Sequence, residues 1–359
     1  MKKLVFITSL FAVIHTYAQE PARVDIPGSQ IQRITSKIVT GQEYELQILL
    51  PGSYKEGIKS YPVLYLMDSQ WDFPLAKSLY GQHYFDGFIP EIIIVGVTWG
   101  GRKPNPDSLR ARDYTPTREA RLPQSGGAEN FLGFFQQELF PFIETKFRTD
   151  TTNRTLMGCS LGGLFTMYTL FTHPNMFANY IAASPAYGWD KQVLYQYEKK
   201  YFESDPKQPA RLYMTIGDVE KGAPGFEKLA AHLTERNYKN LRMRSKVLEN
   251  TGHSGTKTEG FGRGMQFAYE RPAIKPSANI LNRYVGKYTA PTGFIIEIKI
   301  EDNVLVCYVQ GNRYALFAAG ETQFYAKSEF FNIHFSSVND GRIQLRVERY
   351  GRTDIAEKN

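Results

Sequence analysis

Residues 154–165 constrain the fold of this chain more than any other stretch. A short apolar run leads into Gly158-Cys159-Ser160-Leu161-Gly162, a G-x-S-x-G pattern, and a helix-compatible apolar run begins at Leu164. A strand, a glycine-flanked serine and a helix in this order are typical of a nucleophile elbow, a sharp turn that lifts a serine above the edge of a sheet. Both glycines are needed because the serine backbone is strained and side chains there would collide with the neighbouring strand and helix. The alternative is a glycine-rich tight turn without chemistry.

The segments around this turn alternate between strand and helix patterns. Strands are predicted at 44–50, 63–67, 92–97, 177–183, 212–217 and 242–248, and helices at 73–84, 129–147 and 226–237. This alternation indicates a mostly parallel sheet with helices on both faces, and such sheets carry their sites at the carboxyl ends of the strands. We therefore expect Ser160 at that edge. The apolar side chains at helical spacing between 129 and 147 are predicted to be core.

A catalytic serine needs a base, and the sequence offers one strong candidate. A serine hydroxyl is a weak nucleophile until a base takes its proton, and in elbow-type sites the acid and the histidine follow the serine in the chain. The histidines after Ser160 are His173, His232, His253 and His334. Only His253 comes just after a predicted strand, on a loop that starts near Gly252. We predict His253 as the base, with a capping or surface histidine as the alternative.

The sequence contains two candidates for the acid of this triad. Asp218 and Glu220 follow the same predicted strand, and a single carboxylate suffices to hold the imidazole in one tautomer. We favour Glu220, because an aspartate directly after Gly217 is also a natural turn residue. Asp218 stays open as the alternative.

Two backbone N–H groups are predicted to form the oxyanion hole. One belongs to Leu161, the residue after the nucleophile, and the other to the loop after the strand that ends near Asp68. We choose Gln70 for the second donor.

The amino terminus has the pattern of an export signal. Lys2 and Lys3 precede an apolar run over 4–14, and small residues end at Ala18. The run is too short for a membrane helix, although a buried amino-terminal strand has a similar composition. We expect a signal peptide at 1–18, a secreted or periplasmic protein, and no stable membrane insertion.

The charge, the cysteine content and the absence of metal-binding motifs restrict the classes of partner and cofactor that we expect for this chain. The chain has 43 basic and 36 acidic residues, a formal net charge of +7, and the basic residues are spread out, so nucleic acid is not an expected partner. Cys159 and Cys307 do not make a disulfide framework. No C-x-x-C, H-E-x-x-H or carboxylate-rich loop is present, so we expect no metal and no other cofactor.

The stretch 100–127 combines prolines, glycines and basic residues. Its prolines are Pro104, Pro106, Pro116 and Pro123, and its cations are Arg102, Lys103, Arg110, Arg112, Arg118 and Arg121. Such density of helix and strand breakers predicts a long loop. Two interpretations stay open: a basic lid over the site that receives an anionic substrate, or a solvated loop.

With these residues placed, the region 31–269 resembles the esterase D and enterochelin-esterase-like branch of the α/β-hydrolases. This branch also includes feruloyl esterases, acetylxylan esterases and mycolyl transferases. The matching motifs are Val63-Leu64-Tyr65-Leu66-Met67-Asp68, Arg112-Asp113-Tyr114-Thr115-Pro116, Gly158 to Phe165, Ala183-Ser184-Pro185 and Gly217-Asp218-Val219-Glu220. The resemblance implies an α/β-hydrolase fold, Ser160 as nucleophile, Glu220 as acid, His253 as base, and Gln70 as the second oxyanion donor. The family often has histidine where Cys159 stands and glycine where Ser69 stands.

The carboxyl-terminal part changes character. Short strands predicted at 294–300, 304–309, 314–318, 331–335 and 343–347 are separated by turn residues, which indicates a small antiparallel β unit. It resembles the small β domain of unknown function that trails several secreted bacterial hydrolases. We divide the chain into a signal peptide (1–18), an esterase domain (19–274), a linker (275–280) and a small β domain (281–359). This β domain is expected to contact substrate, pack on the hydrolase or mediate association.

The sequence as a whole predicts a cofactor-free serine esterase that works through an acyl-enzyme. The resemblance allows a siderophore ester, a feruloyl or acetyl group on polysaccharide, or a simpler acyl ester. Two alternatives are an acyltransferase with the same triad and a non-catalytic glycan-binding module. The oligomeric state is left open.

Overall fold

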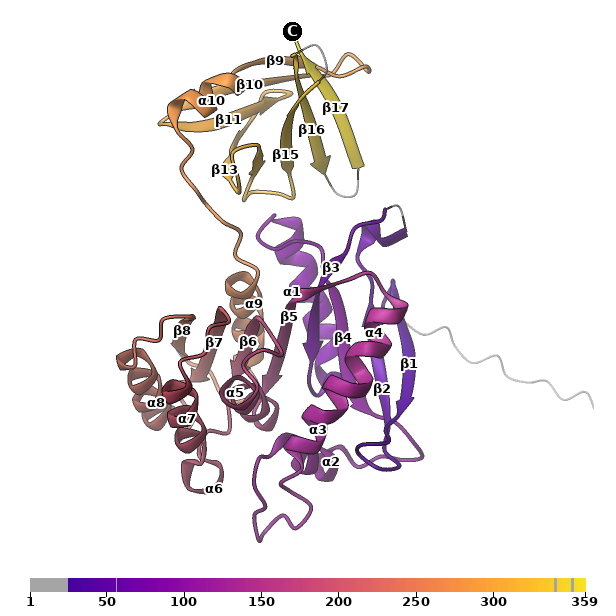
Figure 1. Ribbon diagram of the computed structural model, residues 1–359, viewed down its shortest axis with the longest axis vertical. Helices are drawn as coiled ribbons and strands as arrows, with labels where there is room; N and C mark the ends of the chain where they lie inside the picture. Colours follow the sequence, from indigo (N-terminus) through magenta and orange to yellow (C-terminus); the bar gives the residue numbers. More distant parts are fainter. Residues whose placement is uncertain (1–24, 56, 339–340, 350–351) are drawn as a thin grey trace, which may run out of the picture.

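The computed structural model describes residues 25–55, 57–338, 341–349 and 352–359. The signal peptide expected at 1–18 lies outside these residues. Figure 1 shows a larger α/β body and a smaller β body stacked at one end of it.

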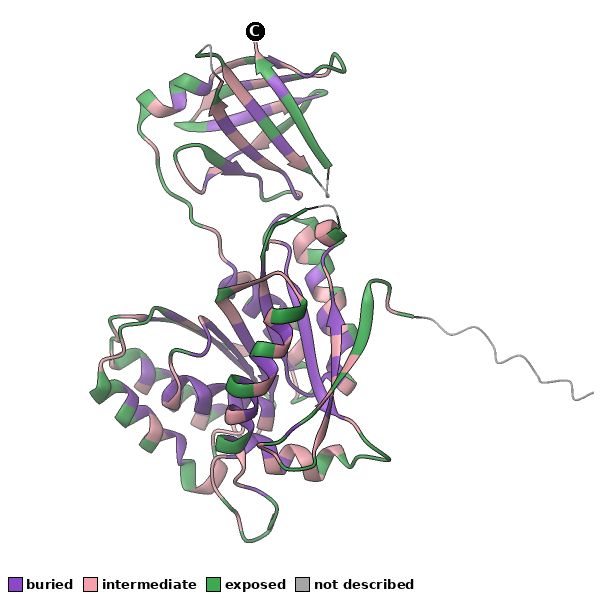
Figure 2. Cartoon of the chain, turned by 45° about the vertical axis from the view of Figure 1, so that its right-hand side comes forward, coloured by how far each residue is buried: buried purple, intermediate pink, exposed green. Residues whose placement is uncertain are grey.

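An eight-stranded sheet forms the centre of the larger body, in the order β1-β2-β4-β3-β5-β6-β7-β8. The strands are β1 (Ser29–Thr35), β2 (Glu43–Leu49), β3 (Tyr61–Leu66), β4 (Ile93–Trp99), β5 (Thr149–Cys159), β6 (Asn179–Ala183), β7 (Ala210–Gly217) and β8 (Leu241–Leu248). β1 and β2 pair antiparallel at one edge, and β4, β3 and β5 to β8 run parallel. Figure 2 shows the central parallel strands largely buried: β3, β4, β6 and β7 are buried almost throughout, whereas the edge strand β8 and the first half of β5 are partly exposed.

Helices cover both faces of this sheet. They are η1 (Gly52–Lys55), α1 (Ser69–Phe85), α2 (Pro106–Tyr114), α3 (Ala128–Phe134), η2 (Phe135–Leu139), α4 (Phe140–Lys146), α5 (Leu161–Thr172), α6 (Trp189–Gln192), α7 (Leu194–Ser204), α8 (Ala223–Glu235) and α9 (Thr256–Ala268). α1 and α9 pack on one face, and α3 to α5, α7 and α8 pack on the other. The predicted α/β-hydrolase fold, a mostly parallel sheet between helices, is confirmed.

The predicted helix at 129–147 is present but changes pitch in its middle. α3 continues through the π-helical turn η2 into α4, which has Pro141 in its first turn. Proline lacks an N–H and its ring collides with the carbonyl one turn earlier, and a wider turn relieves that collision. Phe131, Phe134 and Phe135 are fully buried, as the core prediction requires.

The predicted long loop at 100–127 is wrong in its middle, where α2 forms. Asn105 caps this helix by accepting a hydrogen bond from the Ser108 N–H at 3.2 Å, and Pro106 occupies its first position. Proline is compatible with the first turn of a helix because that N–H has no partner inside the helix. A count of prolines and glycines therefore fails to predict the helix that begins at Pro106.

The smaller body is a nine-stranded antiparallel sheet in the order β12-β11-β10-β9-β17-β16-β15-β14-β13. Its elements are α10 (Ala278–Tyr284), β9 (Gly286–Thr289), β10 (Ile295–Glu301), β11 (Val304–Val309), β12 (Asn312–Ala315), β13 (Phe317–Ala318), β14 (Gln323–Tyr325), β15 (Asn332–Ser337), β16 (Ile343–Arg349) and β17 (Arg352–Lys358). The two terminal strands of this order, β12 and β13, are separated in the chain by Leu316 alone, so the sheet curls round into a barrel. The predicted small antiparallel β domain is confirmed.

α10 and one hydrophobic core complete this barrel. The ring of Tyr284 in α10 stacks on Phe335 at 4.0 Å between centroids, inside a cluster that includes Tyr288 and Phe324. α10 begins at Ala278, so the predicted linker at 275–280 includes the start of this helix.

The barrel contacts the larger body at the carboxyl end of α1. The Phe330 N–H donates to the Phe85 carbonyl at 2.8 Å, and the rings of Tyr84 and Phe330 lie 4.5 Å apart. α1 starts at the carboxyl end of β3 and runs back along the sheet. The barrel therefore lies at the amino end of the parallel strands, away from the edge where Ser160 follows β5 (Figure 1).

Candidate active site

Ser160 lies in the sharp turn between β5 and α5. Its backbone adopts φ 60° and ψ −118°, a region that residues with a side chain rarely occupy. Its N–H donates to the Ala183 carbonyl at 3.0 Å, which anchors the turn to β6. A Cβ on Gly158 would lie 2.5 Å from the carbonyl carbon of Gly162, so only glycine allows strand and helix to approach this closely. This is the geometry of a nucleophile elbow.

The structure brings His253 and Glu220 together. His253 Nδ1 lies 2.6 Å from Glu220 Oε2, and the other oxygen, Oε1, lies 2.6 Å from Ser184 Oγ and 2.9 Å from the Gly217 N–H. Burial alone would raise the pKa of the Glu220 carboxyl, but hydrogen bonds from Ser184, Gly217 and His253 lower this pKa below its usual value. An ionised carboxylate only accepts, so Nδ1 of His253 carries the proton and Nε2 is left as an acceptor.

Asp218 has a different position. Its carboxylate accepts hydrogen bonds from the N–H groups of Asn250 at 3.0 Å and Thr251 at 3.1 Å, and these bonds lower its pKa. It thus holds the loop that carries His253. A Cβ on Gly217 would lie 1.8 Å from the Thr251 carbonyl oxygen, so the close approach of this loop to β7 requires glycine.

The turn between β3 and α1 is held by α2. Asp68 adopts a left-handed conformation with φ 54°, and its N–H donates to the Tyr114 hydroxyl at 3.1 Å. Arg110 binds the Asp68 carboxylate through two hydrogen bonds, of 3.1 and 2.8 Å. Gln70 stands in the first turn of α1 and Leu161 in the first turn of α5, where helix N–H groups have no partner inside their own helix.

A small cavity of about 260 Å³ opens above the elbow. It is lined by Asp68, Trp71, Asp72, Arg110, Cys159, Ser160, His253, Ser254 and Lys257. Ser160 and His253 share this cavity, although no hydrogen bond joins their side chains in the described part of the chain. Catalytic hydrogen bonds are often long in the absence of substrate. None of the barrel residues in the described ranges lines it.

Several residues of this cavity were not singled out from the sequence. Lys257 Nζ lies 2.6 Å from Asp72 Oδ1, and Trp71 is half-exposed beneath the Arg110 guanidinium, which lies 5.5 Å from its ring centroid. Trp71 is a large apolar side chain in the first turn of a helix whose start was predicted a few residues too late, at 73. An earlier helix start would have placed it at the strand edge.

The basic-lid interpretation of 100–127 is correct for one cation at most. Arg110 lines the cavity, and it is already paired with Asp68. Arg112 binds Asp113, away from the cavity. Arg102, Lys103, Arg118 and Arg121 are exposed and do not line it.

Cys159 lies beside the nucleophile but has no thiolate character. Burial raises the pKa of its thiol to about 12. Because the thiolate is the reactive form, this cysteine acts as a packing residue.

Comparison with known proteins matches both bodies. The family model described as "Putative esterase" matches residues 37–258, which is more than half of the chain. The chain belongs to this esterase family. A second model, described as a domain of unknown function, matches residues 270–353 and thus the barrel of this esterase.

Among its relatives is the ferri-bacillibactin esterase BesA of Bacillus subtilis, 31% identical over 211 residues, which cover 55% of this chain and 72% of BesA. The siderophore triacetylfusarinine C esterase of Aspergillus fumigatus is 26% identical over 244 residues, 64% of this chain and 82% of the relative. The solved BES protein from Bacillus cereus superposes with a TM-score of 0.64 at 27% identity, over 70% of this chain and 99% of that one. The chain is therefore a carboxylic ester hydrolase. Within the described residues, no helix combines the length and apolar character needed to cross a bilayer.

Proposed function

We propose that this esterase hydrolyses siderophore-type esters through an acyl-enzyme on Ser160. The observation that carries the proposal is the 2.6 Å contact between His253 and Glu220 at the mouth of the cavity that holds the strained Ser160. Serine, carboxylate and imidazole, in the chain order Ser160, Glu220 and His253, form the triad of elbow-type hydrolases.

In the first half of the reaction, Ser160 Oγ bonds to the ester carbonyl carbon and its proton passes to His253 Nε2. The electron pair of the carbonyl moves to the oxygen, which receives hydrogen bonds from the Leu161 and Gln70 N–H groups. Glu220 stabilises the imidazolium through Nδ1. The carbon–oxygen bond to the alcohol then breaks, and His253 returns the proton to the leaving alkoxide.

In the second half, a water molecule takes the place of the alcohol. Its proton passes to His253 as its oxygen bonds to the acyl carbon, and the second tetrahedral oxyanion is held by the same two N–H groups. Collapse breaks the bond to Ser160 Oγ, which recovers its proton from His253. The products are a carboxylic acid and free enzyme.

The relatives support the siderophore assignment. BesA is named for ferri-bacillibactin and the Aspergillus fumigatus enzyme for triacetylfusarinine C, both siderophores. The cavity is small and open to solvent, and it contains the half-exposed Trp71, a surface on which an aromatic or acyl group can pack.

A labelling experiment tests the mechanism. A fluorophosphonate probe is expected to modify wild-type protein on Ser160, and the Ser160→Ala variant is expected to stay unlabelled and to lose ester hydrolysis by at least about 10³-fold. Absence of label on folded wild-type protein would instead favour a non-catalytic binding module.

A substrate panel tests the assignment of the ester. Ferric and iron-free catecholate or hydroxamate triesters are compared with feruloyl and acetyl sugar esters, with product analysis by mass spectrometry. The highest kcat/KM is expected for a siderophore ester. A preference for the feruloyl ester would replace the substrate while leaving the triad intact, and an acylated product formed from an added alcohol would indicate acyl transfer.

We also infer export through residues 1–18. Lys2 and Lys3, the apolar run after them and the small residues before Gln19 support it. Expression in a bacterial host followed by amino-terminal sequencing of the secreted or periplasmic protein is expected to show a chain that starts at Gln19. An intact Met1 on cytoplasmic protein would contradict the inference.

A further inference from the structure

A second cavity, of about 460 Å³, lies at the junction of the two bodies. Its walls come from β7, β8, α9 and the residues after α9 in the esterase body, from the segment after α1, and from the barrel strand β14 with the residues that follow it. The lining residues are Phe88, Tyr213, Arg244, Ser245, Lys246, Arg263, Gln266, Phe267, Glu270, Arg271, Tyr325 and Lys327. We call this cavity the junction cleft.

Positive charge dominates the junction cleft. Lys246 pairs with Glu259, and Glu270, the only carboxylate among the described lining residues, pairs with Arg242 at 2.6 Å. The four remaining cations, Arg244, Arg263, Arg271 and Lys327, have no carboxylate in ion-pair contact within the described ranges. Three of them are exposed side chains that line the cleft walls.

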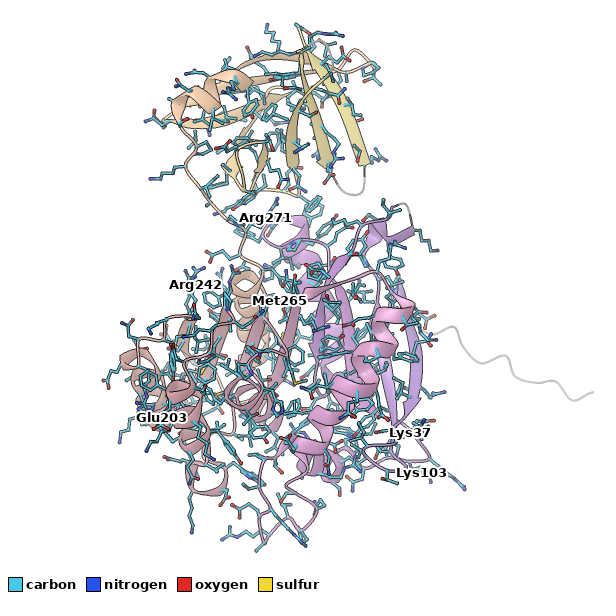
Figure 3. All side chains as sticks on the ribbon, in the orientation of Figure 1. Lys37, Lys103, Glu203, Arg242, Met265 and Arg271 are labelled. Atoms are coloured by element: carbon cyan, nitrogen blue, oxygen red, sulfur yellow. The ribbon has the colours of Figure 1, made fainter. Side chains whose placement is uncertain are left out.

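Arg271 is the exception, because it is partly buried between the bodies. Its guanidinium lies 3.9 Å from the centroid of the Tyr325 ring, and Figure 3 shows it between the esterase body and the barrel. Burial lowers the pKa of Arg271 to about 10. The Glu348 carboxylate opposes this lowering of the pKa only in part. A cation that is removed from water with little counter-charge is unfavourable, and a bound anion relieves that cost.

We propose that the junction cleft binds a small ligand that carries two or more carboxylate or phosphate groups. Arg271 lines the site where the two bodies meet, Arg244 and Arg263 line it from the esterase body, and Lys327 lines it from the barrel. Guanidinium groups match the planar, two-oxygen geometry of these acidic groups. A ligand in this position contacts both bodies and therefore stabilises their contact.

The dimensions favour a small molecule over a polymer. The volume lies within the range of about 300–1,000 Å³ that is usual for small-ligand sites. Phe267, Tyr213 and Tyr325 are buried, and Phe88 is the one exposed aromatic ring among the described lining residues. A single exposed ring does not provide the row of rings on which successive sugars or bases of a polymer stack. Two further cavities also include Arg271, and they give a longer ligand room to extend.

The test measures thermal stability and binding with the full chain at constant ionic strength. Citrate represents the polycarboxylate source and inorganic tripolyphosphate the phosphate source, with sodium chloride as reference. At least one of the two is expected to raise the melting temperature and to bind in calorimetry. Arg271→Gln and the double variant Arg244→Gln/Arg263→Gln are each expected to weaken that binding by about tenfold or more.

The control is Arg283→Gln, which removes an equally charged, exposed side chain on α10 outside the cleft. It is expected to bind like wild type. Hydrolysis of a simple aryl ester reports folding, since the junction cleft contributes no residue to the Ser160 cavity; the double variant is expected to keep this activity even if Arg271→Gln disturbs the junction.

Three outcomes would overturn the proposal. These are no binding of either anion, equal binding by wild type and the folded double variant, or binding confined to polygalacturonate or a single-stranded oligonucleotide. The last outcome would mark a polymer-binding surface instead.

Discussion

The cavity at the carboxyl end of the central sheet and the junction cleft differ in how many of their cations have a carboxylate partner. At the carboxyl end, each basic side chain that lines the cavity has a carboxylate partner: Arg110 with Asp68 at 2.8 Å, Lys257 with Asp72 at 2.6 Å, and His253 with Glu220 at 2.6 Å. In the junction cleft, four cations have no carboxylate at ion-pair distance within the described residues: Arg244, Arg263, Arg271 and Lys327. Figure 3 marks these two regions with Lys103 near the first and Arg271 near the second.

We interpret this contrast as the difference between the proposed catalytic site around Ser160 and the proposed anion-binding site in the junction cleft. Paired groups around Ser160 fix the direction of each side chain, and in the proposed mechanism two charges develop there: the oxyanion, which backbone N–H groups would receive, and the His253 imidazolium, which Glu220 would stabilise. The cations of the junction cleft without an ion-pair partner leave a positive potential there, which the proposed anion would neutralise. Substitutions that remove the carboxylate partner of a group near Ser160, or that add a carboxylate beside a cation of the junction cleft, test this contrast.

The largest effect is expected from the acid that pairs with His253. Glu220→Gln should reduce kcat/KM by about 10³-fold, because the amide no longer enforces the tautomer with the proton on Nδ1. Asp218→Asn is the matched control, since Asp218 accepts only backbone N–H groups in the same turn, and it should reduce kcat/KM by less than about tenfold. Steady-state kinetics on an aryl ester measures both variants. The reverse order would assign the acid to Asp218.

A second substitution leaves a cation near Ser160 without its carboxylate partner, as in the junction cleft. Asp68→Asn leaves the mostly buried Arg110 without its counter-charge, and the free energy of unfolding should fall by about 3 kcal/mol. Urea denaturation measures it. Glu45→Gln removes the partner of Arg33, whose side chain is exposed, and should cost less than about 1 kcal/mol. Equal losses in the two variants would contradict the distinction between the two kinds of pair.

A smaller effect is expected from the hydroxyl that holds the turn before Gln70. Tyr114→Phe leaves the Asp68 N–H without its acceptor, so the predicted oxyanion donor is less firmly placed, and kcat should fall by about tenfold with little change in KM. Tyr65→Phe removes another fully buried hydroxyl, one without a partner in the described residues, and should leave kcat unchanged. Similar losses in both variants would reduce Tyr114 to a packing role.

The smallest effect concerns pH. The pKa of Glu220 is lower in the folded protein than its ordinary value of 4.5, so its contribution to stability is present above that pH and is lost as pH falls through the folded-state pKa. The difference in free energy of unfolding between wild type and Glu220→Gln should therefore be largest near neutral pH and shrink below 4.5. Urea titrations over this range measure it. A difference that grows on acidification would contradict the lowered pKa.

The features that the sequence predicted correctly are local ones. The elbow is contained in five residues, and the fold class follows from alternating patterns, each within one segment. The choice of His253 as base, which stays a prediction, also rests on local sequence, because a loop directly after a strand at a sheet edge is a general position for a base. These inferences needed no knowledge of which distant segments meet.

The features that the sequence did not reveal depend on contacts between distant segments. Lys257 meets Asp72 across 185 positions, and Arg110 meets Asp68 across 42. β17 was missed because most of its residues are polar and exposed, and its place comes from pairing with β16 and β9. The junction cleft combines β8, α9 and the barrel, and no single stretch carries its pattern.

The position of the barrel at the amino end of the parallel strands has a consequence for how this enzyme could be attached to another surface. The barrel lies at the amino end of the parallel strands (Figure 1), and Ser160 follows β5 at their carboxyl end, so a macromolecule bound to the barrel does not stand over the Ser160 cavity. Attachment of the protein to a support through its second body is therefore expected to leave the access of esters to Ser160 unchanged.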